Sequence, residues 1–232
     1  MSRPQFGDKS NFGSGPVSYD TQGPQTLGDN SPIHTAPAER PAAPLQEPAP
    51  SPGARTRSVF VVHGRDEEVR REMFGLLRRL DLRPLEWEDL VKATGQSTPF
   101  IGDVVAQAPA LAQASLVLLT PDDIAMLHPQ LRGEAEPEYE VQPTGQARPN
   151  VLIELGMVLM AYPERTLIVE VGALRQITDI AGRNVIRFDG SESAIGKVVE
   201  RLKQAGCQLN DTGSDWRQTW PFRHLSAYRR RP

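Results

Sequence analysis

Glu154 is the residue whose type and surroundings most strongly indicate chemistry. It is a carboxylate inside the apolar stretch VLIELGMVLM, residues 151–160. Read as a helix that begins near Asn150, this stretch is hydrophobic on almost every side, which predicts an interior position. A buried ionised carboxylate is costly unless it is paired or its chemistry is used. In a partly dry cleft it could stabilise positive charge developing on a substrate; alternatively, it is a structural acid of the first turn, held by the helix dipole and Arg148.

Three other groups of residues could bind a ligand, and each has a structural alternative. Gly64 and Arg65 could admit a phosphate to the start of a helix, or form a turn with a surface arginine. Asp122 and Asp123 could hold ribose hydroxyls or a metal, or cap and tighten a turn. Trp87 could stack on a base, or pack in the core.

Arg148 and Asn150 precede Glu154 closely enough to position it, although a salt bridge and a helix N-cap are the simpler alternatives. No glycine-rich phosphate loop is present, so ordinary kinases, GTPases and dinucleotide-binding dehydrogenases are excluded. The four histidines lack the spacing of metal ligands, and the single cysteine excludes a disulfide framework and a cysteine zinc site. We therefore expect neither a metal nor a resident cofactor.

Short apolar runs alternate with amphipathic stretches along the chain, and these elements must position the candidates. The expected strands are 58–62, 82–87, 115–120, 166–171 and 184–188. After the first strand we expect an amphipathic helix whose apolar face carries Val69, Met73, Leu76, Leu77 and Leu80. A loop at 88–97 is followed by a helix at 99–108, which is expected to bury Phe100, Ile101, Val104 and Val105, and a long loop follows at 121–148. After the fifth strand we expect a last helix whose apolar face carries Ile195, Val198, Val199 and Leu202. This alternation predicts an α/β fold with a five-stranded parallel sheet, flavodoxin-like order 2-1-3-4-5, and helices on both faces.

In such sheets, ligands bind outside the carboxyl ends of the strands, at the switch between the first and third strands. The rule points to His63-Gly64-Arg65, to residues 87–97 and to residues 120–123. Glu154 approaches the same edge if its helix starts at Asn150.

Composition and charge limit the remaining possibilities. The chain has 232 residues and a net charge of −3, which gives no electrostatic case for binding nucleic acid. The apolar run at 151–162 is too short to span a bilayer, and no leader sequence is evident, so we expect a cytoplasmic protein. The basic run at 229–231 reads as a solvated tail.

The chain divides into three parts by composition. Residues 1–57 hold ten of the 21 prolines and little apolar periodicity, which predicts a disordered segment with a Pro/Ala linker at about 36–57. Residues 1–31 repeat a Gly-Asp/Asn theme that could stack into an assembly; a solvated tail is the alternative. Residues 58–206 form the α/β domain, and residues 207–232 are expected to pack back on it irregularly.

Five ordered motifs resemble the bacterial TIR-like family of predicted nucleotide-binding proteins, the TIR type used by anti-phage effectors in cyclic-nucleotide-signalled immunity. The motifs are VFVVHGRD (59–66), LEWEDLVKATGQST (85–98), LVLLTPDD (116–123), RPNVLIELG (148–156) and TDIAGRNVIRF (178–188). The resemblance implies hydrolysis of the N-glycosidic bond of NAD+, with Glu154 as the catalytic residue. It also implies an NAD+ cleft lined by His63, Gly64, Arg65, Trp87, Asp122, Arg148 and Asn150.

This chain departs from the family in two ways. It contains no recognisable second-messenger sensor domain, and Pro149 stands where the family often has a polar residue. Because TIR hydrolases generally need assembly, we expect self-association through TIR domains or residues 1–31, and an upstream immune sensor as a further partner. The alternatives are a non-catalytic adaptor that binds nucleotide or other TIR domains, and a base-exchange or deoxyribosyltransferase-type enzyme.

Overall fold

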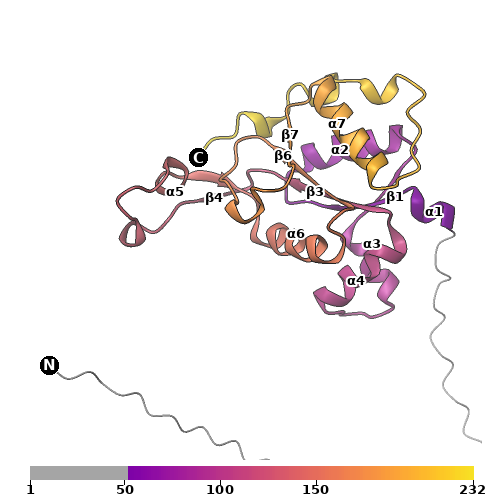
Figure 1. The fold of residues 1–232 in the computed structure, drawn as a ribbon, viewed down its shortest axis with the longest axis horizontal. Helices are drawn as coiled ribbons and strands as arrows, with labels where there is room; N and C mark the ends of the chain where they lie inside the picture. Colours follow the sequence, from indigo (N-terminus) through magenta and orange to yellow (C-terminus); the bar gives the residue numbers. More distant parts are fainter. Residues whose placement is uncertain (1–51) are drawn as a thin grey trace, which may run out of the picture. The chain divides into compact units, whose positions relative to one another are not determined.

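Five parallel strands form the centre of the structure, a computed structural model that describes residues 52–232. They are β1 (Ser58–Val62), β2 (Arg83–Leu85), β3 (Ala114–Leu119), β6 (Thr166–Val171) and β7 (Ile186–Phe188). Their spatial order is β2-β1-β3-β6-β7 (Figure 1), which is 2-1-3-4-5 in chain order. The predicted sheet and its order are therefore confirmed.

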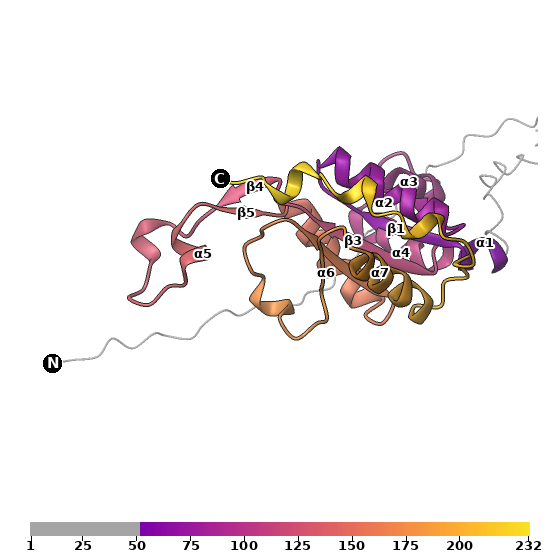
Figure 2. The same cartoon turned by 90° about the horizontal axis from the view of Figure 1, so that it is seen from above.

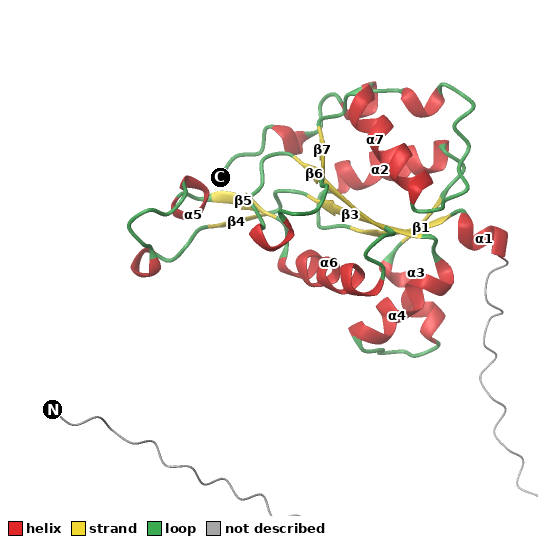
Figure 3. Cartoon of the chain, viewed as in Figure 1, coloured by secondary structure: helices red, strands yellow, loops and turns green. Residues whose placement is uncertain are grey.

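Helices cover both faces of this sheet, as the alternation predicted. On one face lie α2 (Glu67–Arg79) and α7 (Glu192–Gln204); on the other lie α3 (Trp87–Thr94), α4 (Ile101–Leu111) and α6 (Pro149–Ala161) (Figures 1 and 3). The apolar faces predicted for α2 and α7 are buried, with each of their named side chains at most 2% exposed.

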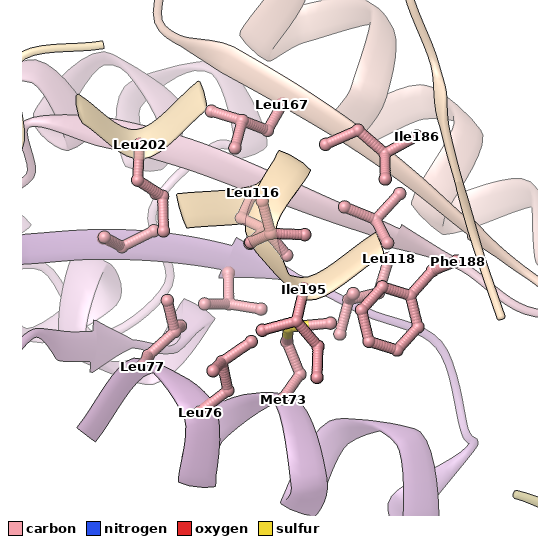
Figure 4. Close-up of a cluster of buried hydrophobic side chains, with 14 of the residues drawn as sticks. Met73, Leu76, Leu77, Leu116, Leu118, Leu167, Ile186, Phe188, Ile195 and Leu202 are labelled. Carbon is pink, nitrogen blue, oxygen red and sulfur yellow. The ribbon is translucent and has the colours of Figure 1, made fainter. Parts of the chain in front are cut away.

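Both faces of the central strands are buried, which explains their uninterrupted apolar sequences. In β1, Val59 and Val61 enter the cluster beneath α2 and α7, whereas Phe60 and Val62 enter the cluster beneath α3, α4 and α6. Figure 4 shows the first cluster, where side chains of α2 and α7 meet those of β3, β6 and β7. Successive strand residues point to opposite faces, so one five-residue strand supplies both cores.

The long loop predicted at 121–148 forms an arm that extends from the rest of the domain in both views (Figures 1 and 2). It contains the antiparallel pair β4 (Asp123–Ala125) and β5 (Thr144–Gln146), the 3-10 turn η1 (Pro129–Leu131) and the short helix α5 (Glu138–Val141). At its base, Arg175 pairs with Glu140, and the Arg175 backbone N–H donates to the Gly145 carbonyl at 2.7 Å. The base of the arm is thus bonded to the segment that follows β6.

Residues 88–97 are not a loop, as the sequence suggested, because most of them belong to α3. Glu86 precedes this helix in a reciprocal capping arrangement with Asp89, and Gly95 ends it with a left-handed φ of 66°. These caps define the ends of the helix, and burial of Leu90 against the sheet stabilises its two turns. Trp87 is consequently the first residue of a helix and not the end of a strand.

Two expectations about apolar burial are wrong. Phe100 and Ile101 are 82% and 52% exposed, because α4 begins at Ile101 and the side that it turns toward the sheet carries Val104, Val105 and Ala108. The apolar helix α6 is not interior: Ile153 and Met160 are 56% and 88% exposed. A helix that covers one face of a sheet has only one side to bury, whatever the composition of its other side.

Both ends of the described chain pack on the α/β domain. Residues 52–56, part of the predicted linker, form the short helix α1 (Pro52–Thr56), whose last carbonyl accepts from the Gln208 N–H at 2.9 Å. Residues 207–232 contain the 3-10 turns η3 (Asp215–Arg217), η4 (Trp220–Phe222) and η5 (Ser226–Tyr228). Phe222, Leu225 and Ala227 are at most 1% exposed, so the extension contributes to the core.

The other predictions for the N-terminal segment, including assembly through residues 1–31, concern residues outside the described range. Among residues 52–232, no helix combines the length and hydrophobicity that a membrane crossing requires.

Gly172→Ala should destabilise the protein, because Gly172 has a φ of 85° and a Cβ there would lie 2.4 Å from the Ala227 carbonyl oxygen. We expect the free energy of unfolding to fall by about 2 kcal/mol or more, measured by chemical denaturation. Gly182→Ala is the control: a Cβ there meets nothing within 4 Å, and the change should stay within about 0.5 kcal/mol. Equal stability of Gly172→Ala and wild type would contradict this packing of the C-terminal extension.

Candidate functional site

Glu154 lies in the second turn of α6 without a partner. Pro149 is the first residue of the helix, whose first turn contains no acidic residue. Burial raises the pKa of Glu154 from its ordinary value of 4.5 to about 7. Among the described residues, no hydrogen bond or ion pair reaches its carboxylate, and Arg148 pairs instead with Asp123 at 3.5 Å. The structural alternative, a first-turn acid paired with Arg148, is therefore wrong.

Helix geometry places Glu154 on the side of α6 nearer to α4. Leu152 lines a cavity with the segment after β6, on the β6–β7 side of α6. Glu154 is two residues further along, which is a rotation of roughly 200° about the helix axis. Glu154 therefore projects from the side of α6 opposite to that cavity. The helix α4, which precedes β3 and packs against α6, lies on this side, because β3 is on the side of β6 away from β7.

A second group of predicted residues meets at the carboxyl ends of β1 and β3. The Arg65 backbone N–H donates to Asp122 Oδ2 at 2.7 Å. A Cβ on Gly64 would lie 1.9 Å from the same oxygen, so glycine is required for this approach. His63 Nδ1 lies 3.0 Å from the Gly64 carbonyl oxygen, and its ring packs edge-on against Phe74. The turn after β1 is thus bound directly to the turn after β3.

Arg230 completes this group, and the sequence did not indicate it. Its guanidinium lies 2.9 Å from Asp66 Oδ2 and 3.6 Å from Asp122 Oδ1. The Asp66 and Asp122 side chains are only 3% and 4% exposed. The solvated tail predicted for residues 229–231 is wrong for its middle residue, which is an ion-pair partner of two buried carboxylates. The only available signal was the charge of the run, which does not indicate a partner.

The remaining predicted site residues are Trp87 and Asn150. Trp87 is half-buried against the core beneath α3, α4 and α6. Asn150 is exposed at the second position of α6, and Arg148, not Asn150, occupies the N-cap position. No hydrogen bond or ion pair within residues 52–232 joins either Trp87 or Asn150 to Glu154.

Two cavities are lined by the segment that follows β6, where the sequence predicts no site. One has a volume of about 270 Å³ and is lined by Leu152, Arg175 and Ile177 among others. The second, of about 780 Å³, lies beneath the segment 172–185, which includes the 3-10 turn η2 (Thr178–Ile180). Neither is lined by Glu154 or by any residue predicted to contact NAD+. The sequence signal for these cavities was weak, because the segment read only as a loop.

A comparison with known protein families matches residues 58–190 to the TIR domain of CAP12/Pycsar effector proteins. The match covers more than half of the chain, including the whole parallel sheet through β7. The chain therefore belongs to this family of bacterial anti-phage effector TIR domains. A comparison with curated proteins finds no match.

Glu154→Gln should increase stability at alkaline pH. Since the folded-state pKa of about 7 lies above the ordinary 4.5, the folded protein binds the extra proton, and stability falls as pH rises between these values. We expect the substitution to raise the free energy of unfolding by about 1–3 kcal/mol at pH 8 and to change it little near pH 4.5. Chemical denaturation at both pH values measures this difference.

Glu164→Gln, in the exposed turn after α6, is the matched control and should change stability by less than about 0.5 kcal/mol at either pH. If Glu154→Gln gave the same small change at both pH values, the desolvation of Glu154 would be disproved.

Proposed function

We propose that this TIR domain hydrolyses NAD+ at the nicotinamide–ribose bond, and that it acts in this way as an anti-phage effector. The observation that carries the proposal is Glu154: a carboxylate without a partner, partly desolvated, with a pKa of about 7. Unpaired and desolvated carboxylates are characteristic of catalytic positions. The TIR family supplies the context in which a single such group has a reaction to perform.

One carboxylate is chemically sufficient for this reaction. Breaking the nicotinamide–ribose bond develops oxocarbenium character at the anomeric carbon, as in glycoside hydrolysis. Ionised Glu154 would stabilise that charge and orient the attacking water, which transfers its proton to the carboxylate as the new bond to oxygen forms. Nicotinamide leaves as a neutral base, so the leaving group needs no general acid. A carboxylate without a protein partner is free to make these contacts.

The other residues of the edge would bind the rest of NAD+. Gly64 and Arg65 lie immediately before α2, where a helix N-terminus favours phosphate. Trp87, half-buried at the start of α3, offers an aromatic surface for stacking. Asp122 would accept from ribose hydroxyls, while Arg148, held by Asp123, and Asn150 lie at the start of the helix that carries Glu154. These assignments are part of the proposal.

Wild-type protein at high concentration should release nicotinamide from NAD+, and Glu154→Gln should lower the rate at least about 100-fold, the usual contribution of a positioned acid or base. The loss is expected because the neutral amide of glutamine cannot stabilise positive charge at the anomeric carbon. Glu164→Gln should keep the wild-type rate. Absence of nicotinamide release, or equal release by Glu154→Gln, would refute the proposal; product analysis by mass spectrometry separates hydrolysis from base exchange.

The pH dependence of kcat/KM provides an independent test. Because the ionised form of Glu154 is required and its pKa is about 7, kcat/KM should fall about tenfold per pH unit well below pH 7 and level off above it. Glu164→Gln should show the same profile. A profile without a break between pH 5.5 and 8.5 would assign the chemistry to another group.

A non-catalytic adaptor is the second candidate, and the exposed apolar side chains favour it. Phe100, Ile101, Ile153 and Met160 are each more than half exposed on α4 and α6, as expected for a surface that associates with other proteins. The same surface would serve assembly in the enzymatic proposal. If Glu154→Ala abolishes cellular toxicity while leaving the size of the assembly unchanged, the adaptor is excluded.

A further inference from the structure

Arg230 contacts two buried carboxylates at the edge where a nucleotide would bind. Asp66 lies at the end of the turn after β1, and Asp122 in the turn after β3. A single guanidinium reaches both, at 2.9 Å and 3.6 Å. The Arg230 side chain itself is 36% exposed, so it covers the two aspartates from the solvent side.

Each aspartate uses one oxygen within the fold and leaves the other without a hydrogen bond. Asp66 Oδ1 accepts from the Val69 N–H at 3.0 Å and caps α2. Asp122 Oδ2 accepts from the Arg65 N–H at 2.7 Å. The remaining oxygens, Asp66 Oδ2 and Asp122 Oδ1, are buried and accept no hydrogen bond, although Arg230 lies beside both. Arg230 thus balances the charge of both oxygens without donating a hydrogen bond to either, which leaves their capacity to accept hydrogen bonds unused.

The chain up to Tyr228 is firmly packed, whereas residues 229–232 are not. Leu225 and Ala227 are at most 1% exposed. The Ser226 N–H donates to Glu68 Oε2 at 2.8 Å. Beyond Tyr228, the polar side-chain contacts are those of Arg230 with Asp66, Asp122, Ser226 and the Pro121 carbonyl. The last four residues can therefore move without unfolding the core, and their end lies beside β4 in both views (Figures 1 and 2).

We propose that Asp66 Oδ2 and Asp122 Oδ1 form a binding site for the vicinal hydroxyls of a ribose, and that Arg230 is its internal competitor. Both oxygens lie beside one guanidinium and so face a common space; once Arg230 has left, they are suited to accept hydrogen bonds from two neighbouring hydroxyls. When Arg230 occupies the site, a ribose cannot reach these oxygens. Binding of the sugar requires residues 229–232 to move away, so this segment restrains access to the edge. The identity of the ligand as a ribonucleotide rests on the proposed function; the competition does not.

The test is the binding of ADP-ribose to the full chain by isothermal titration calorimetry. Arg230→Ala should bind ADP-ribose about five- to tenfold more tightly than wild type, because the fraction of open sites no longer limits the apparent affinity. An ADP-ribose analogue without the two hydroxyls of its terminal ribose should show no such gain. Adding Asp122→Asn to Arg230→Ala should reverse it.

Arg229→Ala and Arg231→Ala are the matched controls, because these neighbours are exposed and carry the same charge. Both should bind ADP-ribose as wild type does. Arg230→Gln provides a second variant of similar length, for which a gain in the same direction is expected. Thermal melting of every variant establishes that it is folded.

Unchanged or weaker binding of ADP-ribose by both Arg230 variants would overturn the proposal, as would an equal gain by Arg229→Ala. NAD+ turnover is measured on the same proteins. Tighter binding by Arg230→Ala without turnover by any variant would refute the enzymatic proposal alone, whereas turnover with no effect of Arg230 on binding would refute the competition alone.

Discussion

Burial of both faces of the parallel sheet is the constraint on which the rest of the structure depends. Strands such as β1 and β3 carry apolar side chains on both sides, and each face must be covered by helices. Charged side chains are thereby excluded from β1 and β3 and lie instead in the turns that follow these strands. All five strands run in the same direction, so their carboxyl ends meet at one edge, and the polar turns after β1 and β3 are brought together there.

The carboxylates near this edge have two different environments: Asp66 and Asp122 are paired, whereas Glu154 is not. Asp66 and Asp122 are almost fully buried, and their charge is balanced by Arg230 and by backbone N–H groups. Glu154 is less buried and has no partner among residues 52–232, and desolvation raises its pKa to about 7. The first arrangement stabilises charge in a fixed position. The second leaves a group that changes protonation state near neutral pH, which is the property that acid/base chemistry requires.

Apolar composition did not determine which residues are inside. The α6 helix is apolar around its circumference, yet it lies on the surface of the domain with Ile153 and Met160 exposed. One side of α6 packs on the sheet with Val151, Leu155 and Val158, and the opposite side is an exposed apolar surface. The exposed Ile153 directly precedes Glu154 in this helix.

Local periodicity in the sequence was enough to predict the strands and the buried faces of α2 and α7. The strand order followed from the rules for parallel sheets, and Glu154 was recognised as a single charge within an apolar stretch. The sequence prediction was wrong for α3, whose residues were assigned to a loop. It was also wrong for Phe100 and Ile101, which were expected to be buried, since the exposure of a side chain depends on what its helix packs against. Only the tertiary structure showed that Arg148 pairs with Asp123 and that Arg230 reaches Asp66 and Asp122. Pairs between charges far apart in the chain depend on the packing of the whole domain, which no local pattern encodes.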